Sequence, residues 1–453
     1  MRAARLAVGG ALVGLVATMA AVPAVAQTQP TSASLSTSVL TDGTLGRSGV
    51  TPAARRKPQG FIPDKGVLLS NPYASNRREI LTRVIQTIKN TAKGQTVRIA
   101  VWNFADPPTT KALVRADQRG VNVQLVVAGS VVGPQWEAVK AQLNRNKSDD
   151  SFAVKCKGAC RSRAKIMHSK VFLFSRVRSV KNISMFGSAN LTTPAGNRQW
   201  NDMVTTYSPQ LYDYFVTMFD EYAKDRRAKK VYQEVDLGHD RVYLYPTGKD
   251  RNPIRDELRL VRCNGAKGMP GGHTKIRIAI AGWFDDYGTQ IAKRVRRLWE
   301  QGCDVKIITT LAGRGVNRTL KSGRGRGPVP IRRLEVDNNG DGVAERYLHM
   351  KAIAITGVFD RNPRAKVVIT GSPNWSARAA RSDEVLVRLA RAGGMALKYQ
   401  RHVDNLFSSP YTHTNPPSQG TTDLNARGLA PVRLSPREFY RLGDRLPSWY
   451  ELD

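Results

Sequence analysis

Two segments of the sequence place a histidine and a lysine two residues apart at the head of an apolar run. His168 and Lys170 lie in KIMHSKVFLF, and His349 and Lys351 lie in YLHMKAIAI. In a β-strand, side chains two residues apart point to the same face, so each pair is expected to face one site. An imidazole can act as a nucleophile or as a general acid and base, and an ammonium group can neutralise an anionic substrate.

A second motif follows each histidine by about twenty residues. ISMFGSANL contains Ser188 and Asn190, and VVITGSPNW contains Ser372 and Asn374, so both segments are apolar strands that close on Gly-Ser-x-Asn. A glycine at this point lets the backbone approach a ligand closely. The serine and asparagine side chains supply hydrogen-bond donors for the oxygens of a bound anion.

An acidic residue follows each asparagine. Asp202 comes twelve residues after the first asparagine and Glu384 ten after the second, with Asp383 as a close alternative to Glu384. An acid behind each histidine would fix the tautomer and orientation of its ring. Two lysines and two asparagines could hold the non-bridging oxygens of a phosphodiester, while one imidazole attacks phosphorus and the other protonates the leaving alcohol. The set predicts phosphodiester chemistry that requires no metal.

The elements that must position these residues repeat in the same order in both halves of the chain. The apolar patterns predict strand, helix, strand, helix and strand between 66 and 129, and again between 241 and 309. Equivalent positions lie 175 to 182 residues apart, and the two histidines lie 181 apart. Strands alternating with helices indicate βαβ units and a largely parallel sheet. We expect an α/β fold of two similar α/β/α-sandwich halves with one active site at their interface.

The start of the chain has the pattern of a cleaved signal peptide. A basic start precedes an Ala/Val/Leu/Gly run and a small-x-small signal, which places cleavage near Ala26-Gln27. No later segment approaches the roughly 20 apolar residues needed to span a bilayer, so we expect secretion. The predicted parts are a signal peptide (1–26), a flexible leader (27–60), an N-terminal half (61–235), a C-terminal half (236–405) and an irregular tail (406–453).

Four cysteines fit an oxidising compartment. They allow three pairings, of which the simplest is Cys156–Cys160 and Cys263–Cys303. Zinc at CKGAC is the competing interpretation, but no second short-spaced Cys/His pair accompanies it. The segment DNNGDGVAERYL resembles a calcium loop, yet it has Leu348 where a bidentate glutamate is expected, so we interpret it as a polar turn.

The formal net charge is +35, from 71 lysines and arginines against 36 acidic residues. A charge of this size favours contact with a polyanion, which could be nucleic acid, an anionic membrane surface or a cell-wall polymer. The apolar content of 41% suits a folded protein and excludes a disordered one. The net charge therefore indicates a polyanionic partner but does not say which of these polyanions it is.

The duplicated His-x-Lys and Gly-Ser-x-Asn motifs resemble the phospholipase D superfamily over residues of about 60 to 405. The resemblance implies a covalent phosphohistidine, no cofactor or required metal, and a ping-pong exchange that ends in hydrolysis or transfer. By analogy it implies His168 as nucleophile and His349 as acid and base. Family members often have an aspartate five residues after the lysine, where this chain has Ser175 and Thr356. The matching positions are His168, Lys170, Ser188 and Asn190 in one half and His349, Lys351, Ser372 and Asn374 in the other.

Three functions are compatible with these features. The first is a secreted phospholipase D, a phosphoric diester hydrolase that cleaves the headgroup of a glycerophospholipid at a membrane surface as a monomer. The second is a metal-independent secreted nuclease, favoured by the charge and by GSPNWS. The third is a non-catalytic polyanion-binding protein, against which the intact histidines, lysines and asparagines of both copies argue. We expect them in that order.

Overall fold

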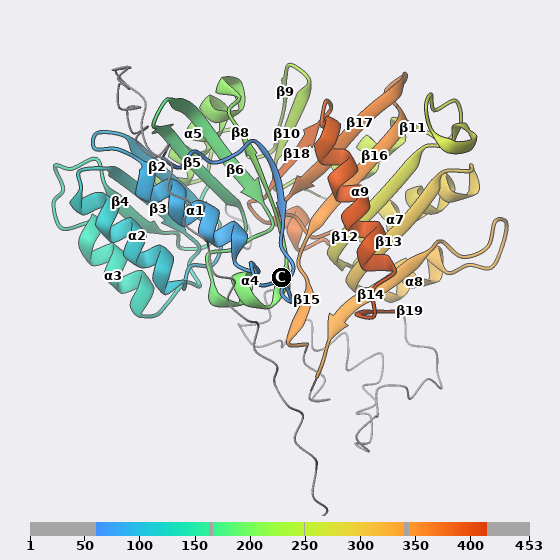
Figure 1. Ribbon diagram of the computed structural model, residues 1–453, viewed down its shortest axis with the longest axis horizontal. Coiled ribbons are helices and arrows are strands. Elements are labelled where there is room, and N and C mark those ends of the chain that lie inside the picture. Colours follow the sequence, from blue (N-terminus) through green and yellow to red (C-terminus); the bar gives the residue numbers. More distant parts are fainter. Residues whose placement is uncertain (1–59, 163–165, 249, 339–343, 415–453) are drawn as a thin grey trace, which may run out of the picture. The chain divides into compact units, whose positions relative to one another are not determined.

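The computed structural model describes residues 60–162, 166–248, 250–338 and 344–414 (Figure 1). The chain divides into two units, Met1–Pro58 and Gln59–Asp453, and all of the described residues lie in the second. The predicted signal peptide, all but the last residue of the predicted leader, and the tail from 415 lie outside the described residues. No helix within the described ranges combines the length and apolar composition of a membrane span.

The N-terminal half is built on a sheet of seven strands in the order β1-β8-β6-β5-β2-β3-β4. Only β2, β3 and β4 are parallel neighbours, and the other pairs are antiparallel. The strands are β1 (Gly66–Leu69), β2 (Thr96–Val101), β3 (Asn122–Val127), β4 (Phe152–Lys155), β5 (Lys170–Val177), β6 (Val180–Gly187) and β8 (Asp202–Thr206). The helices are α1 (Glu79–Asn90), α2 (Pro107–Gln118), α3 (Pro134–Leu143), α4 (Thr193–Asn197) and α5 (Pro209–Ala223).

The C-terminal half forms the larger sheet, which also takes in β7 (Gln199–Trp200) from the N-terminal half. Its other strands are β9 (Gln233–Leu237), β10 (Asp240–Leu244), β11 (Val261–Arg262), β12 (Lys275–Trp283), β13 (Asp304–Ala312), β14 (Ile331–Val336), β15 (Arg346–Leu348), β16 (Lys351–Phe359), β17 (Asn362–Gly371), β18 (Val385–Leu389) and β19 (Thr412–Thr414). The helices are α6 (Pro253–Arg259), α7 (Asp285–Glu300), α8 (Arg314–Leu320) and α9 (Gly393–Phe407), with 3-10 turns at Pro270–Gly272 and Ala379–Arg381.

The same strand order recurs in both sheets. The run β10-β18-β17-β16-β12-β13-β14 repeats β1-β8-β6-β5-β2-β3-β4, with the parallel pairs at the same places. The sheets are mixed, so the expectation of largely parallel sheets was wrong. The hairpins β5–β6 and β16–β17 are antiparallel, but their inner residues are buried on both faces. Such strands read as continuous apolar runs, which do not distinguish parallel from antiparallel pairing.

Helix formation follows the apolar spacing and the capping residues. In α1 the buried residues Ile80, Leu81, Val84 and Ile88 recur at helical spacing and form one face. In α2 the chain enters the helix at Asp106, whose carboxylate accepts a hydrogen bond from the Thr109 backbone N–H. These helices begin where strands end, which leaves the strand ends to carry the site.

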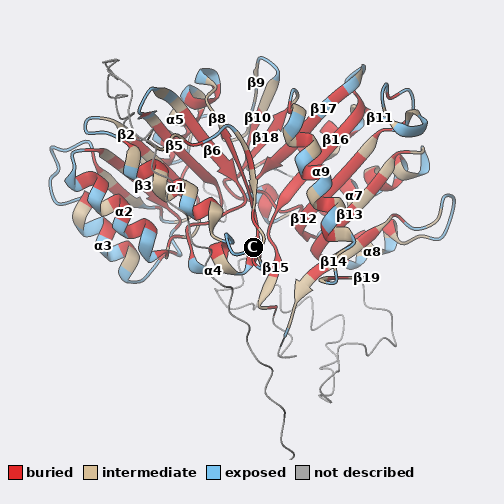
Figure 2. Ribbon diagram, in the orientation of Figure 1, coloured by how far each residue is buried: buried red, intermediate tan, exposed pale blue. Residues whose placement is uncertain are grey.

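Buried residues concentrate along the strands (Figure 2), and they fall into three main clusters. One cluster joins the N-terminal sheet to α1, α2 and α3, and another joins the C-terminal sheet to α6, α7 and α8. The third contains buried residues of α5 and α9 together with strands from both sheets. Each half is therefore a sheet with helices on its two faces, as predicted, and the two inner faces share one core.

The segment from 406 is more regular than predicted where it is described. Helix α9 continues to Phe407, and Thr412–Thr414 form β19, which pairs antiparallel with β14. The composition of this segment gave no strand signal. Its pairing comes from the open edge of β14, a tertiary contact that the local sequence does not encode.

The predicted disulfide pairing is confirmed. Cys156 bonds Cys160 across a separation of four residues, and Cys263 bonds Cys303 across forty. The first bridge excludes the zinc interpretation of CKGAC, because both of its thiols are used. The second connects the segment after α6 to the start of β13, and so closes a loop around β12 and α7.

Removing the longer bridge should cost more stability than removing the shorter one. A cross-link restricts the unfolded chain more as its loop lengthens, so Cys263→Ser/Cys303→Ser should lose about 2–4 kcal/mol, and Cys156→Ser/Cys160→Ser less. Guanidinium denaturation of the two double variants against the wild type measures both losses. Equal losses, or a larger loss from the shorter loop, would contradict the expectation.

Candidate active site

The two His-x-Lys motifs lie at equivalent strand starts. Strand β5 begins at Lys170 and β16 begins at Lys351, so each histidine stands just before its strand. The two lysines lie opposite Val101 at the end of β2 and Ile280 near the end of β12. The predicted residues of both half-sites are no more than 2% exposed.

Each histidine is anchored by the opposite half of the protein. The His168 backbone N–H donates to the Asp383 carbonyl at 2.9 Å, and the His349 N–H donates to the Trp200 carbonyl at 2.9 Å. The pairing of β15 with β7 extends the second contact into a short parallel ladder. This reciprocal exchange brings the two half-sites together at the interface between the halves.

The lysines and asparagines adopt matching hydrogen bonds in the two halves. Lys170 Nζ donates to the His168 carbonyl at 2.6 Å, and Lys351 Nζ donates to the His349 carbonyl at 2.7 Å. The Oδ1 atoms of the two motif asparagines accept from main-chain N–H groups at the ends of β2 and β12, Asn103 at 3.4 Å and Gly282 at 3.1 Å. The NH₂ group is therefore the end of each amide that can donate to an anion.

The glycine before each motif serine allows two strands to approach closely. A Cβ at Gly187 would lie 2.3 Å from the Asp202 carbonyl oxygen, and one at Gly371 would lie 2.0 Å from that of Val385. Ser188 and Ser372 follow, and their Oγ atoms accept from the backbone N–H groups across the ladder, at 2.9 and 3.0 Å. These serines fix the strand ends, and so help to position the asparagines two residues later.

Glu384 lies behind the first histidine. Nδ1 of His168 donates to the Glu384 carboxylate, with both oxygens at 2.9 Å, and both side chains are fully buried. The predicted alternative, Asp383, contacts His168 through its main-chain carbonyl instead. The carboxylate that accepts from His168 therefore comes from the C-terminal half, 216 residues away in sequence.

Asp202 does not have the position predicted for a supporting acid. Its Oδ2 accepts from Thr370 Oγ1 and from the Tyr399 hydroxyl, both at 2.5 Å. The residue behind His349 is Asn201, whose Oδ1 accepts from the ring Nδ1 at 2.9 Å. The prediction sought a carboxylate, so it passed over the amide one residue earlier. A comparison of equivalent positions in the segments that follow the two Gly-Ser-x-Asn motifs could have identified Asn201.

Asp383 ties the disulfide loop to the site. Its Oδ2 accepts from the Arg161 backbone N–H at 2.8 Å, and its carbonyl accepts from Ser169 Oγ at 3.2 Å as well as from the His168 N–H. Burial raises the pKa of the Asp383 carboxyl to about 6, against hydrogen bonds from Ser162 and Arg161 that lower it. The segment after the Cys156–Cys160 bridge is thereby held against the backbone of the first histidine.

Aromatic rings line the site unequally. The Trp102 ring meets His168 edge-on with centroids 4.9 Å apart, and Lys170 Nζ lies 5.2 Å from the same tryptophan ring. The backbone N–H of Trp102 donates to the residue after His168, and that of Ala281 donates to the residue after His349, so alanine occupies the equivalent place. Next to the second half-site, a Cβ at Gly282 would touch both Phe284 and Asn374.

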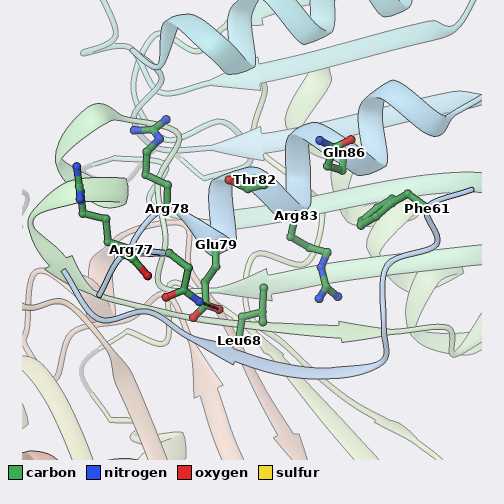
Figure 3. A pocket seen from close by; sticks show the side chains of 10 residues that line it. Phe61, Leu68, Arg77, Arg78, Glu79, Thr82, Arg83 and Gln86 are labelled. Atoms are coloured by element: carbon green, nitrogen blue, oxygen red, sulfur yellow. Dashed lines mark hydrogen bonds between the residues drawn. The ribbon is translucent and has the colours of Figure 1, made fainter. Parts of the chain in front are cut away.

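A surface cavity of about 410 Å³ lies elsewhere, along α1 (Figure 3). Its lining includes Arg77, Arg78 and Arg83 but none of the motif residues. Arg78 pairs with Asp106 at 2.6 Å and Arg83 with Asp64 at 3.2 Å. Much of the positive charge at this cavity is thus paired with acids. Among the described residues, no group of three or more His, Cys, Asp and Glu side chains is arranged to hold a metal ion.

Comparison with known proteins supports the resemblance seen in the motifs. Residues 84–223 match the family model described as "Cardiolipin synthase, PLD-like domain", a stretch that includes the first His-x-Lys and Gly-Ser-x-Asn. The match is confined to residues 84–223, and it identifies a phospholipase D-like domain in that part of the chain. No curated protein sequence matches the chain.

The chain resembles several solved structures at low sequence identity. The chain is similar to phosphatidylserine synthase of Haemophilus influenzae Rd KW20, with a TM-score of 0.50, 14% identity and coverage of 78% of this chain and 89% of that one. Polyphosphate kinase of Porphyromonas gingivalis has a TM-score of 0.48 and 11% identity, with coverage of 77% of this chain and 53% of that one. The chain therefore spans about half of that enzyme. Nuc, a phospholipase D family member from Salmonella typhimurium, has a TM-score of 0.27 and 21% identity, with coverage of 35% of this chain and 94% of that one.

Proposed function

We propose that the protein is a secreted phospholipase D-type phosphodiesterase that cleaves the headgroup of glycerophospholipids through a phosphohistidine intermediate. The observation that carries the proposal is the pair of buried histidines, each anchored by the opposite half and each with Nδ1 donating to an oriented acceptor. Because Nδ1 of each ring is engaged, the reacting atom of each ring is Nε2. Two such nitrogens meet the need for one nucleophile and one proton carrier.

The lysines and asparagines supply the electrostatic part of the mechanism. Lys170 and Lys351 bring two positive charges to a site with side chains no more than 2% exposed. Charge that moves onto the non-bridging oxygens in the transition state is stabilised more strongly in such a low-dielectric site than in water. The amides of Asn190 and Asn374 add oriented donors. One imidazole attacks phosphorus, and water or an alcohol then resolves the adduct.

The apolar surroundings of the second half-site favour a lipid. Ala281, Leu311, Ala344 and Tyr347 form a small apolar cluster, and Phe284 packs against it. The Phe284 ring and the Asn374 side chain both approach Gly282. An apolar wall beside a phosphate site suits the diacylglycerol part of a phospholipid. Two disulfides support an oxidising, extracellular location. Hydrolysis and transfer to another alcohol use the same adduct, so both outcomes belong to the proposal.

A secreted nuclease of the same superfamily is the second candidate. The net charge of +35 favours it, since phosphate backbones bind basic surfaces by releasing counterions. An anionic membrane surface attracts the same positive charge, so the net charge does not favour nucleic acid over lipid. The apolar cluster beside the second half-site therefore decides our preference for a lipid. The two candidates share the histidine chemistry and differ in what lies on either side of the phosphate.

A paired assay in EDTA tests the proposal. Purified mature protein is given mixed phosphatidylcholine and phosphatidylethanolamine vesicles in one arm, and plasmid and single-stranded DNA in the other. We expect release of choline or ethanolamine from the vesicles, and none from a His168→Ala control, which would attribute the activity to this site. Cleavage of DNA without lipid turnover would support the nuclease instead. Turnover of neither substrate would contradict both candidates.

A further inference from the structure

The two half-sites differ in the group that accepts the hydrogen bond from the histidine ring. The glycine that ends β6 pairs with Met203, and the glycine that ends β17 pairs with Leu386. Two residues before these partners stand Asn201 and Glu384, which therefore hold equivalent positions. One histidine faces a carboxylate and the other faces a neutral amide.

The orientation of the Asn201 amide is fixed by its neighbours. Its Nδ2 donates to the Ala195 carbonyl at 3.2 Å and to Gln199 Oε1 at 3.0 Å. Its Oδ1 accepts from Ser188 Oγ at 2.8 Å and from His349 Nδ1 at 2.9 Å. Because both ends of the amide are engaged, a flip would set donors against donors and acceptors against acceptors. Asn201 thus holds the His349 ring with its proton on Nδ1 and adds no charge.

Formation of a phosphohistidine changes the charge on the two rings in opposite directions. The attacking ring starts neutral, gains a bond from Nε2 to phosphorus and keeps its Nδ1 proton, so it becomes positive. The proton-donating ring starts positive and becomes neutral when its Nε2 proton passes to the leaving oxygen. A carboxylate stabilises a positive ring, which assists the first change and opposes the second. A neutral amide orients a ring without retaining its proton.

We propose that Asn201 is a positioning residue that makes His349 the proton donor, while Glu384 makes His168 the nucleophile. In the first step His168 Nε2 bonds to phosphorus, the bond from phosphorus to the headgroup oxygen breaks, and that oxygen takes the His349 proton. In the second step His349 takes a proton from water, the water oxygen bonds to phosphorus, and the electron pair of the N–P bond returns to His168. The assignment rests on the proposed function and gives a physical reason for an order that the resemblance only implied.

A burst experiment with bis(4-nitrophenyl) phosphate in EDTA separates the two roles. Nitrophenolate leaves without being protonated, so the first step then needs the nucleophile but not the acid. We expect His349→Ala to release about one nitrophenolate per protein molecule and then stop, since the second step lacks its base. We expect His168→Ala to release none above background. The adduct in His349→Ala should map to the peptide that contains His168.

Other outcomes overturn the assignment. A burst in His168→Ala that is absent from His349→Ala would reverse the roles. Loss of the burst from both folded variants would contradict the assignment of one histidine as nucleophile and the other as proton donor. Thermal melts of both variants show that they are folded. If the wild type cleaves neither this diester nor phospholipid, the proposed function fails. If the wild type is active and the burst appears in the wrong variant, only the inference fails.

The role of Asn201 is tested through the leaving group. With Asn201→Ala we expect choline release from phosphatidylcholine, whose alkoxide must be protonated, to fall about 100-fold. The rate of the nitrophenolate burst should change by less than about threefold, because that step needs no acid. A merely structural defect would slow both reactions together. Equal losses would therefore overturn the role of Asn201 even if the histidine assignment held.

Discussion

Replacement of Glu384 by glutamine is expected to slow phosphodiester cleavage by about 10,000-fold, the loss seen when the acid behind a catalytic histidine becomes an amide. The carboxylate accepts from His168 Nδ1 at 2.9 Å through both oxygens, and no part of the pair is exposed. A glutamine of the same shape removes the negative charge that, in the proposed mechanism, stabilises the His168 ring once it is bonded to phosphorus. Initial rates on phospholipid vesicles, with a thermal melt beside them, measure the effect.

Glu257→Gln is the matched control. Glu257 is also buried, at 1% exposure, and interacts with Tyr243 and Arg388 in a cluster that includes no motif residue. Its replacement should change the thermal stability and leave the turnover within about threefold of the wild type, since surroundings away from the site affect folding and not the chemistry. If the two glutamine variants lost activity equally, Glu384 would have no special role.

Replacement of Gly371 by alanine is expected to lower activity by about 100-fold or more, because a catalytic group displaced by about 1 Å loses that much. The added Cβ would stand 2.0 Å from the Val385 carbonyl oxygen, and the residue has φ +158°. To relieve the contact, β17 must move away from β18, and Ser372 and Asn374 move with it. Turnover and circular dichroism measured together distinguish a displaced site from an unfolded protein.

Gly394→Ala provides the comparison for that variant. Gly394 lies in the first turn of α9, and a Cβ there would meet nothing within 4 Å. Alanine is the better helix former, so this change should leave activity intact and raise stability slightly. Full activity in Gly371→Ala would show that the close strand approach at the motif glycine does not position the site.

The sequence predicted those parts of the site that each half carries by itself. Each His-x-Lys and each Gly-Ser-x-Asn motif lies within a short stretch of sequence, so its residues can be recognised from the sequence alone. Pairing each cysteine with its nearest neighbour in the sequence was enough to predict the disulfides. Local apolar patterns were enough to predict the alternation of strands and helices. The mixed character of the sheets was missed, because fully buried strands show no periodicity that reports direction.

Glu384 was predicted as a supporting acid, but the pairing of each histidine with its acceptor was not, because these pairings depend on contacts between the halves. Glu384 meets His168 across 216 residues, and Asn201 meets His349 across 148. Asn201 was passed over for Asp202 because chemical expectation favoured a carboxylate, although only one of two adjacent side chains on a strand can face the site. Which one does so depends on the register of β8 with β6, and that register is a tertiary fact.

The reciprocal backbone contacts between the halves have a consequence for how the site can vary. If two identical subunits assembled such a site around a symmetry axis, any substitution would appear on both sides of the phosphate at once. A single chain is free of that constraint, and here it carries Asn201 opposite Glu384 and Trp102 opposite Ala281. Under the proposed roles, covalent linkage would let one half bond to phosphorus and the other transfer protons, while the contacts between the halves hold both half-sites in place.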